Sequence, residues 1–413
     1  MTTFGHTQDA AGLDSLVGME YHWRRMDSSA RFSAPRTRSG SAAADPAAAV
    51  RLVAEGFLST SPDDYRPEGY DGEMVYGGGR EIVYCVASLW SNLLACARTL
   101  GDGALEDRLV AAFGPFARGK RAVFAHVPHV DFSVVGAVPL EIAVLRGDRR
   151  AREMGLALAD AQWAEPRAGD PEPPRNPQPL EVRLRWWRLG YSPETRLWID
   201  DTYMISALQT AAFRATGDVR YVDRAARELL LYAERLRRPD GLFAHDDGHR
   251  LAWGRGNGWM AAALPLVLRC LAPDDPRREP LGDVFRGFAD ALLPLQRPDG
   301  LWGQLLDDPS SWTESSGSAM AAHAFAEGIR LGWLDGPRFG PAVDRAWRAL
   351  AARLDARGNL AGTCQGTGPS SDPAHYLSRP CPNGDPHGQA AFVWLCRSLL
   401  EGPASRAPDA PPR

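Results

Sequence analysis

The sequence contains little cysteine and no motif that would put cysteine to use. Six cysteines are spread over 413 residues, and no two of them stand in a Cys-x-x-Cys arrangement. Zinc ribbons and thioredoxin-like redox sites are therefore excluded. Scattered single cysteines are typical of small buried residues in a reducing compartment, so we expect a cytoplasmic protein.

The chain also lacks an excess of charge and any long apolar run. Its 47 basic and 51 acidic residues leave a formal net charge of −4, which gives no electrostatic reason to expect nucleic acid or an anionic membrane as a partner. No apolar run approaches the ~20 residues of a membrane span. The first residues lack the basic and then apolar pattern of a secretory signal. The composition predicts a soluble globular protein.

Strand-like alternation is nearly absent, and short phrases recur instead. LRRPDGLFAHDDG (236–248) is echoed by LQRPDGLWGQLLDD (295–308) and more faintly by LDARGNLAGT (354–363). Each phrase follows a run with apolar residues at three- and four-residue spacing, which predicts a helix and then a turn whose glycine takes a positive φ. A second phrase, Gly-Asp-x-Arg, predicts helix starts capped by Asp148 and Asp218.

Helix pairs that repeat about every 50–60 residues are typical of stacked αα-hairpins, which either stay open as a solenoid or close into a barrel. The connecting segments here are long, divergent and rich in Trp, His and Asp, as expected of loops that line one mouth of a closed barrel. We therefore predict an all-α protein with the (α/α)6-barrel fold, a six-hairpin toroid.

One large closed architecture also suits a chain of this length. We expect residues 46–401 to form a single (α/α)6-barrel domain that opens with a helix at 46–58. Residues 1–45 are predicted to be a partly irregular N-terminal extension, and the Pro-rich residues 402–413 a disordered tail. RLRWWRLGY (183–191) mixes Arg with Trp as single-strand nucleic-acid binders do, but without a basic surplus we interpret it as a loop at the barrel rim.

Two adjacent acids stand at the head of an apolar helical run in WIDDTYMISALQTAAFRATGD (198–218). Asp200 lies four residues before Met204 and therefore on the apolar, inward stripe that continues to Leu208. Asp201 is rotated by about 100° and is expected to be a cap or a solvated neighbour. The spacing alone fits a plainer explanation equally well, in which both are acids favoured at the start of a helix.

Another candidate acid, Asp131, stands at the head of an apolar helix behind His126 and His129 in HVPHVDFSVVGAVPLEIAVLRGD (126–148). The plainer explanation applies here too. Two acids at equivalent places in successive repeats favour a function, because a closed barrel would point both of them at its axis. Paired carboxylates in an apolar cup are the usual equipment for protonating and hydrating a sugar.

The stretch HDDGHRLAWGRGNGW (245–259) offers two kinds of site. His245 and His249 are four residues apart, a spacing found in metal sites, but Gly248 disfavours a regular helix that would carry both. We therefore expect no metal and no other cofactor.

In the same stretch Trp253 and Trp259 bracket Arg255 and Asn257, with glycines that let the backbone approach a ligand closely. Flat aromatic faces and a planar guanidinium suit a pyranose ring that bears a carboxylate. Core packing accounts for one tryptophan but poorly for an arginine and an asparagine of exposed type. Near the C-terminus, in NGDPHG (383–388), His387 is either a ligand contact or a cap of the final helix.

Together these phrases resemble the unsaturated rhamnogalacturonyl hydrolases of glycoside hydrolase family 105, which is related to the unsaturated glucuronyl hydrolases of family 88. The resemblance extends from about residue 70 to about residue 400 and rests on HVDFSVVGAVPLEI, WIDDTYM, WGRGNGW, TESSGSAM, GIRLGWLD and NGDPHG. It implies an (α/α)6 barrel that acts on oligosaccharides left by polysaccharide lyases. In the family an aspartic acid protonates C4 of a 4,5-unsaturated uronic acid, water adds at C5, and the hemiketal opens to release a keto acid, without metal or nucleotide.

The resemblance also assigns roles to residues. The family's W-x-D-x-x-x-M pattern falls on Trp198, Asp200 and Met204, which implies that Asp200, and not Asp201, is the catalytic acid. Asp131 matches the family's second active-site aspartate. The substrate-contacting loop matches His245, Trp253, Arg255 and Trp259. HDDGH departs from many relatives, which have an aromatic or small residue after the His, so the contacts to a second sugar stay open.

Two other functions fit the same fold. A sugar epimerase or isomerase needs paired histidines that face the axis, a role for which His126, His129 and His245 are candidates, although the acids fit better. A non-catalytic carbohydrate-binding protein would not need buried acids. The sequence does not distinguish a galacturonyl from a glucuronyl substrate, and it does not indicate an oligomeric state.

Overall fold

The computed structural model describes residues 45–60, 82–117, 127–173 and 177–402. The chain divides into two compact units, Met1–Arg36 and Thr37–Arg413, and everything that follows concerns the second. The predicted N-terminal extension (1–45) and C-terminal tail (402–413) lie outside the described residues except for Asp45 and Gly402.

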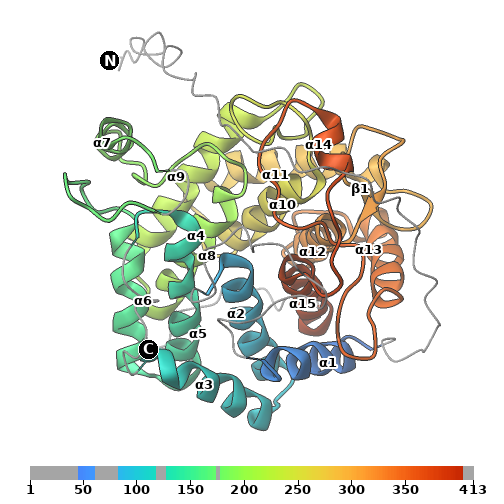
Figure 1. Ribbon diagram of the computed structural model, residues 1–413, viewed down its shortest axis with the longest axis horizontal. Coiled ribbons are helices and arrows are strands. Elements are labelled where there is room, and N and C mark those ends of the chain that lie inside the picture. The colour runs from blue at the N-terminus through green and yellow to red at the C-terminus, as the bar shows by residue number, and fades with distance from the viewer. Residues whose placement is uncertain (1–44, 61–81, 118–126, 174–176, 403–413) are drawn as a thin grey trace. The chain divides into compact units, whose positions relative to one another are not determined.

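An inner ring of helices forms the framework of this unit (Figure 1). Each helix contacts the next in chain order, and the last contacts the first, so the ring is closed. The inner helices are α2 (Tyr84–Thr99), α5 (Ala137–Arg146), α8 (Asp201–Thr216), α10 (Gly254–Leu268), α12 (Ser315–Arg330) and α15 (Pro386–Glu401). Helices α10, α12 and α15 are buried on nearly all sides, as a position between neighbours on both sides of a ring requires.

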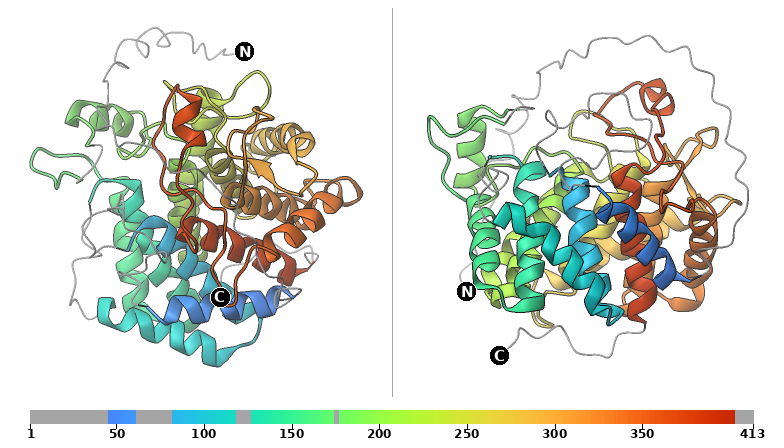
Figure 2. Two further views of the ribbon diagram at one scale, coloured as in Figure 1. Left: turned by 45° about the vertical axis from the view of Figure 1, so that its right-hand side comes forward. Right: turned by 60° about the horizontal axis from the view of Figure 1, so that its bottom comes forward.

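A second layer of helices packs outside the ring, one against each inner helix (Figure 2). Helix α1 packs against α15, so the first and last described helices meet. The outer helices are α1 (Pro46–Leu58), α3 (Gly103–Ala117), α6 (Arg149–Ala161), α9 (Val219–Leu236), α11 (Arg278–Leu292) and α13 (Gly336–Ala351). The predicted all-α class, the six-hairpin (α/α)6 barrel and the helix at 46–58 are confirmed.

Turn glycines follow these helices and aspartates cap their starts, as the sequence predicted. Gly241, Gly300 and Gly358 take φ values of 86°, 89° and 83° in the three recurrent turns, where a residue with a Cβ would be strained. Asp148 and Asp218 cap α6 and α9 by accepting hydrogen bonds from backbone N–H groups.

The remaining elements lie in the connections that lead from an outer helix to the next inner helix. They are α4 (Val130–Ser133), η3 (Val134–Gly136), α7 (Leu180–Arg188), η4 (Leu293–Leu295), α14 (Pro373–Leu377) and the antiparallel pair β1 (Trp302–Gly303) and β2 (Thr313–Glu314). We call the end of the ring at which these connections lie the mouth.

One prediction about these connections is wrong. RLRWWRLGY is not a rim loop, because most of it forms α7. Its Leu, Arg and Trp residues are compatible with a helix, and Trp186 is buried with its ring edge-on to Tyr191, at a centroid distance of 6.0 Å.

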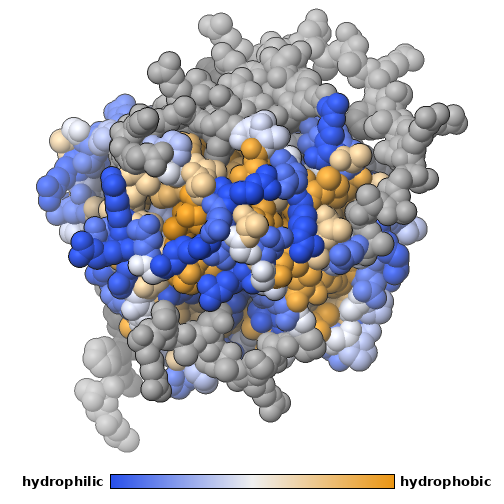
Figure 3. All heavy atoms as spheres, turned by 90° about the horizontal axis from the view of Figure 1, so that it is seen from below, coloured by the Kyte–Doolittle hydropathy of each residue, from blue (hydrophilic) through white to orange (hydrophobic). Residues whose placement is uncertain are grey.

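The described surface agrees with the balanced composition. On the face seen in Figure 3, hydrophilic and hydrophobic residues interleave. None of the described helices combines the length and apolarity needed to cross a membrane.

Candidate active site

Backbone contacts join neighbouring connections at the mouth. Isolated β-bridges pair Trp198 with Asp246 and Trp253 with Leu305. The N–H of Gly254 donates to the carbonyl of Gln304 at 2.8 Å. Three successive connections are therefore fixed to one another, and side chains that start on different loops meet.

Asp200 occupies the position just before α8, with helical backbone angles, but its side chain caps nothing. The residue is 9% exposed. Its Oδ2 atom is buried without a hydrogen-bond partner among the described residues and lies 3.7 Å from Nε2 of His245, which is also unpartnered. A helix-start acid in a purely structural role would accept backbone N–H groups, so the plainer explanation does not account for Asp200.

Burial is the main reason that Asp200 holds a proton more tightly than usual. Desolvation raises the pKa of Asp200 to about 7, and the negative charges of Asp131 and Asp201 add to the effect against the opposing charge of Arg255. Near neutral pH a large share of this carboxyl is therefore protonated. The predicted causes, an apolar setting and a neighbouring Asp131, are both confirmed.

Asp131 lies in the first turn of α4, with a side chain 19% exposed. The Nη2 group of Arg196 donates to its Oδ1 at 3.4 Å, and Nδ1 of His129 lies 3.8 Å from its Oδ2. The two acids therefore differ. Asp131 has a cationic partner, whereas Asp200 is desolvated and faces a histidine.

Asp201 is neither the cap nor the solvated neighbour that the sequence predicted, because it is fully buried and does not cap α8. Its carboxylate is ion-paired with Arg196 and accepts a 2.7 Å hydrogen bond from the hydroxyl of Tyr232 on α9. It also accepts from the backbone N–H of Arg196 at 3.0 Å. The 100° rotation from Asp200 points Asp201 away from the mouth, but into packed protein rather than water.

His245 is fully buried between the acid and an aromatic wall. Its Nδ1 shares a 2.7 Å hydrogen bond with the hydroxyl of Tyr376, and its ring lies 4.5 Å from the Trp253 ring between centroids. Burial holds the pKa of His245 well below its usual range, so the ring is neutral. Trp198 lies edge-on to His245 at 6.2 Å. The structure therefore gathers His245, Trp253 and Trp198 around Asp200 as predicted.

Arg255 is not an arginine of exposed type, since it is fully buried. Its guanidinium lies 4.6 Å from the Trp253 ring centroid and donates to the carbonyls of Cys364 and Gln365 at 2.5 and 2.8 Å. Its Nε has no partner among the described residues. Arg255 therefore fixes the last connection at the mouth through its two terminal nitrogens.

Asn257 and Trp259 lie beneath the mouth rather than at it. Asn257 accepts from the N–H of Phe243 and donates to the Phe243 and Trp253 carbonyls, at 2.8 to 3.0 Å, so its amide is fully used by the fold. The Trp259 ring packs on Tyr203 in the core. Both side chains therefore contribute to the fold, and their predicted substrate contact stays a prediction.

The glycines of WGRGNGW also serve packing, not close approach to a ligand. A Cβ at Gly254 would lie 2.4 Å from the Gly303 carbonyl oxygen, and one at Gly258 would lie 2.7 Å from Sδ of Met320. These glycines let α10 approach β1 and α12, a requirement that no local pattern reveals.

His387 lies within the first turn of α15, and Asp385 is the residue that caps the helix. Its Nδ1 contacts Oδ1 of Asp385 at 2.5 Å, and its Nε2 contacts the hydroxyl of Tyr84 at 2.6 Å. Both ring nitrogens are thus engaged by protein, and burial lowers the pKa of His387. Of the two predicted roles, neither a ligand contact nor a cap describes it.

The histidines of the rival functions are engaged in other ways. His129 uses Nδ1 to accept the N–H of Asp131 and Nε2 to contact Arg196, while His126 lies outside the described residues. His249 contacts Asp246 through Nδ1 at 2.8 Å. Within the described part of the chain, no group of three or more His, Cys, Asp or Glu residues is arranged to hold a metal ion.

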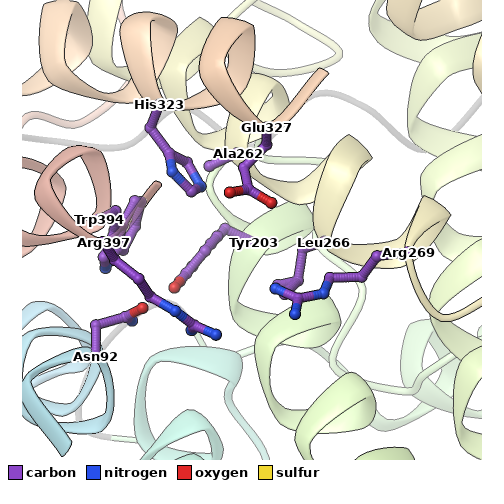
Figure 4. A pocket seen from close by; sticks show the side chains of 9 residues that line it. All are labelled: Asn92, Tyr203, Ala262, Leu266, Arg269, His323, Glu327, Trp394 and Arg397. Atoms are coloured by element: carbon purple, nitrogen blue, oxygen red, sulfur yellow. The ribbon is translucent and has the colours of Figure 1, made fainter. Parts of the chain in front are cut away.

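A small hollow lies between side chains of the inner helices α2, α8, α10, α12 and α15 (Figure 4). Its cavity volume is about 30 Å³, which suits about two water molecules and is far too small for a sugar. It is lined by Asn92, Tyr203, Ala262, Leu266, Arg269, His323, Glu327, Trp394 and Arg397. The mouth is therefore the better location for a saccharide.

Sequence reasoning missed two residues of the site, Arg196 and Tyr376, and gave His129 a role only in a rival function. Arg196 and Tyr376 contact the predicted acids and His245 directly, and His129 contacts Arg196. Arg196 lies five residues before Asp201, a spacing with no meaning in a helix. The left-handed backbone at Leu197, with φ of 57°, brings Arg196 and Asp201 together, and no sequence pattern predicts this conformation.

A closed six-hairpin barrel with a desolvated acid among aromatic side chains at its mouth defines a class of carbohydrate-active enzymes. Comparison with known proteins agrees with this class. The chain belongs to Glycosyl Hydrolase Family 88, whose family profile matches residues 80–401. The resemblance to families 105 and 88 that the sequence motifs indicated is thereby confirmed.

Several known proteins are similar to the chain. An unsaturated 3S-rhamnoglycuronyl hydrolase of Alteromonas sp. (strain LOR) is 28% identical over 264 residues, which span 59% of this chain and 61% of that protein. An enzyme of the same name from Formosa agariphila is 29% identical over 209 residues, 46% of this chain and 52% of that protein. The chain therefore aligns with about half to two thirds of the length of these curated relatives.

Solved structures share the fold over a larger part of the chain. A possible member of family GH105 from Salmonella enterica superposes with a TM-score of 0.70 and 19% identity, covering 89% of this chain and 96% of that one. The unsaturated glucuronyl hydrolase of Bacillus sp. GL1 superposes with a TM-score of 0.60 and 19% identity, covering 86% and 96%. At these identities the likeness establishes the fold.

Proposed function

We propose that the protein removes the non-reducing 4,5-unsaturated uronic acid from oligosaccharides made by polysaccharide lyases. The observation that carries this proposal is the state of Asp200, a buried carboxyl whose pKa is raised to about 7 by desolvation and whose Oδ2 has no partner among the described residues. Protonation of a carbon–carbon double bond needs an acid that still holds its proton near neutral pH.

The proposed reaction is a hydration. Asp200 gives its proton to C4 of the enol ether, positive charge develops at C5, and water adds there. A proton from this water returns to the Asp200 carboxylate, so one water is consumed and the acid is restored. The hemiketal at C5 then opens to a ketone, and the ring oxygen becomes a hydroxyl on C1, which makes C1 a hemiacetal. This hemiacetal collapses to an aldehyde, which breaks the glycosidic bond: the unsaturated sugar departs as a keto acid and the next sugar keeps the glycosidic oxygen as a hydroxyl.

The surroundings of Asp200 suit this sequence of steps. Asp131 is ion-paired with Arg196 and acts as the ionised member, which stabilises positive charge as it develops. Neutral His245 faces Asp200 with an unpartnered Nε2, in a position to hydrogen-bond a hydroxyl group or the attacking water. Trp198, which is half-buried, supplies a flat apolar face of the kind that sugar rings pack on, and the buried Trp253 supports His245 from behind.

For the linkage, we propose a substrate in which the unsaturated uronate is joined to rhamnose. The support is that two similar proteins are named unsaturated 3S-rhamnoglycuronyl hydrolases and a third, from Bacillus subtilis, an unsaturated rhamnogalacturonyl hydrolase. No cofactor takes part in the proposed reaction.

The test is to follow the ultraviolet absorbance of the conjugated double bond while the protein is incubated with lyase-generated fragments of rhamnogalacturonan, ulvan and glycosaminoglycan. We expect absorbance to fall fastest with a rhamnose-linked fragment. Asp200→Asn should lower the rate by about 10²-fold or more. The matched control Asp344→Asn, an exposed acid on α13, should leave it unchanged. Absorbance that stays constant with every fragment, or a fully active Asp200→Asn variant, would contradict the proposal.

A further inference from the structure

Arg196 lies between two carboxylates of the site, those of Asp201 and Asp131. Its Nε donates to Oδ1 of Asp201 at 3.0 Å, and its Nη2 donates to Oδ1 of Asp131 at 3.4 Å. Its Nη1 contacts Nε2 of His129 at 2.6 Å, and the guanidinium lies 5.0 Å from the Trp198 ring centroid. The side chain is 6% exposed, so water screens these interactions little.

Asp201 and its neighbours hold the Arg196 guanidinium in place. Asp201 is fully buried and receives a second donor from Tyr232, whose hydroxyl also accepts the N–H of Leu197 at 3.2 Å. Leu197 has the only positive φ of any non-glycine residue in the described ranges, 57°. A left-handed leucine is strained because its Cβ crowds the following carbonyl oxygen, and such strain persists only where the surroundings over-determine it.

The turn at Leu197 gives the site acids different surroundings. The turn at Leu197 directs Arg196 toward Asp131 and places Asp200 three residues beyond Leu197, at the start of α8. One cation therefore lies against both Asp131 and Asp201, while Asp200, next to Asp201 in the chain, makes no ion pair with it among the described contacts.

We propose that Arg196 is a positioning residue that decides which site carboxylate keeps a proton: it holds Asp131 ionised and thereby leaves the proton of the pair on Asp200. This inference rests on the proposed function, because it assigns the two protonation states that the hydration requires. Asp201 and Tyr232 are the parts of the device that keep the guanidinium in place.

Several charged or titratable groups face Asp200 from different elements, and their effects are distinct. Burial, then Asp131 and Asp201, raise the pKa of Asp200, while Arg255 and Arg196 lower it. His245 faces it as a neutral ring. Arg196 itself is charged throughout, since Asp201 and Asp131 outweigh burial and raise its pKa.

Loss of the Arg196 charge should shift the titration of Asp131 and Asp200 in one direction. A pair of interacting carboxylates titrates in two steps that belong to the pair. A nearby positive charge favours the ionised form in both steps. Without it, both steps move to higher pH. The acidic limb of the pH–rate profile, where the pair must lose its first proton, and the basic limb, where Asp200 loses the catalytic proton, should therefore shift together.

The experiment compares Arg196→Gln and Arg196→Lys with the wild type over the full pH range, using the unsaturated oligosaccharide that the wild type cleaves fastest. We expect both limbs of kcat/KM to move up by about 1–3 pH units in Arg196→Gln, the size of effect that a close opposite charge produces. Arg196→Lys keeps the charge, so its limbs should return toward the wild-type positions even though its rate stays lower.

A structural role alone would give a different pattern. A uniform fall in rate with both limbs unmoved in Arg196→Gln, or equal shifts in the Gln and Lys variants, would overturn the inference. Arg220→Gln is the matched control, because Arg220 is an exposed arginine on α9 that pairs with Asp160 and Asp218. Its limbs should not move.

Arg196→Gln leaves Asp201 buried without its cation, which threatens folding. The double variant R196Q/D201N is compared with Asp201→Asn alone, because Asp201 is neutral in both and only the Arg196 charge differs. An infrared titration supplies a readout without substrate: the carboxylic acid signal that is lost in Asp200→Asn should titrate at higher pH in the double variant than in Asp201→Asn. An unmoved signal overturns the inference, whereas a wild type that cleaves no fragment overturns the proposed function alone.

Discussion

Replacement of Asp200 by asparagine should stabilise the fold at alkaline pH at the same time as it abolishes turnover. The unfolded chain releases this proton near its ordinary pKa of 3.8, whereas burial raises the pKa of Asp200 in the folded protein to about 7. Between these values the folded state binds more protons than the unfolded state, so its stability falls as pH rises. At 1.36 kcal/mol per pH unit over about three pH units, the cost is ~4 kcal/mol above pH 7.

Asparagine has the shape of aspartic acid but does not ionise, so the variant escapes this cost. Near pH 4 the Asp200 carboxyl is protonated in the folded state and only about half ionised in the unfolded state, so the two proteins should unfold at similar urea concentrations. The advantage of Asp200→Asn should grow through pH 5 and 6 and reach ~4 kcal/mol at pH 8. Urea midpoints measured at each pH by circular dichroism are sufficient to follow the difference.

Asp201→Asn is the matched control, one residue away and with the opposite expectation. Its carboxylate is fully buried against Arg196 and Tyr232, and breaking a buried ion pair costs about 3–5 kcal/mol. This variant should therefore be less stable at every pH. The reasoning fails if the stability difference between Asp200→Asn and wild type is the same at pH 5 and pH 8, because the desolvated carboxyl would then carry no cost.

Three further outcomes follow from contacts described above. Arg255→Lys keeps a charge but cannot donate to both loop carbonyls, so kcat/KM should fall by about tenfold or more while the Arg220→Lys control is unchanged; wild-type kinetics would show that the fixed loop does not matter. Tyr232→Phe removes one donor to Asp201 and should lower the free energy of unfolding by about 1–3 kcal/mol, and an unchanged urea midpoint would argue against that network. Exhaustive chelation should leave the rate of double-bond loss unchanged, and a loss that a divalent ion restores would refute the metal-free reaction.

The barrel was predictable because its signals are local. Apolar spacing, a turn glycine and an aspartate cap each act within a few residues, and three of the turns recur with the same left-handed glycine at Gly241, Gly300 and Gly358. Closure of the ring into a barrel could also be inferred from the sequence, but from a different feature: the connections between helices are long and differ from one another.

The site was predictable only in part. The helical stripe correctly placed Asp200 at the mouth, because the direction of a side chain follows from its helix. The environment of Asp201 was not predictable, since Tyr232 on α9 and the left-handed turn at Leu197 decide it. Arg255 and Asn257 were expected to meet substrate because of their polarity, but partners more than ten residues away in sequence use their donors. Contacts between residues on different loops depend on how the loops pack in the folded chain, and no local sequence pattern predicts them.

All six inner helices begin at the mouth, which gives this end of the ring an electrical character that the net charge of −4 does not suggest. Each helix start carries about half a positive charge from its unpaired N–H groups, and six of them converge here. Glu314 and Asp385 cap α12 and α15 and offset part of this field, whereas Asp200 does not cap α8. An oligosaccharide with one anionic end would therefore be drawn in by that end first, so that the uronate arrives at the acid and the rest of the chain stays outside.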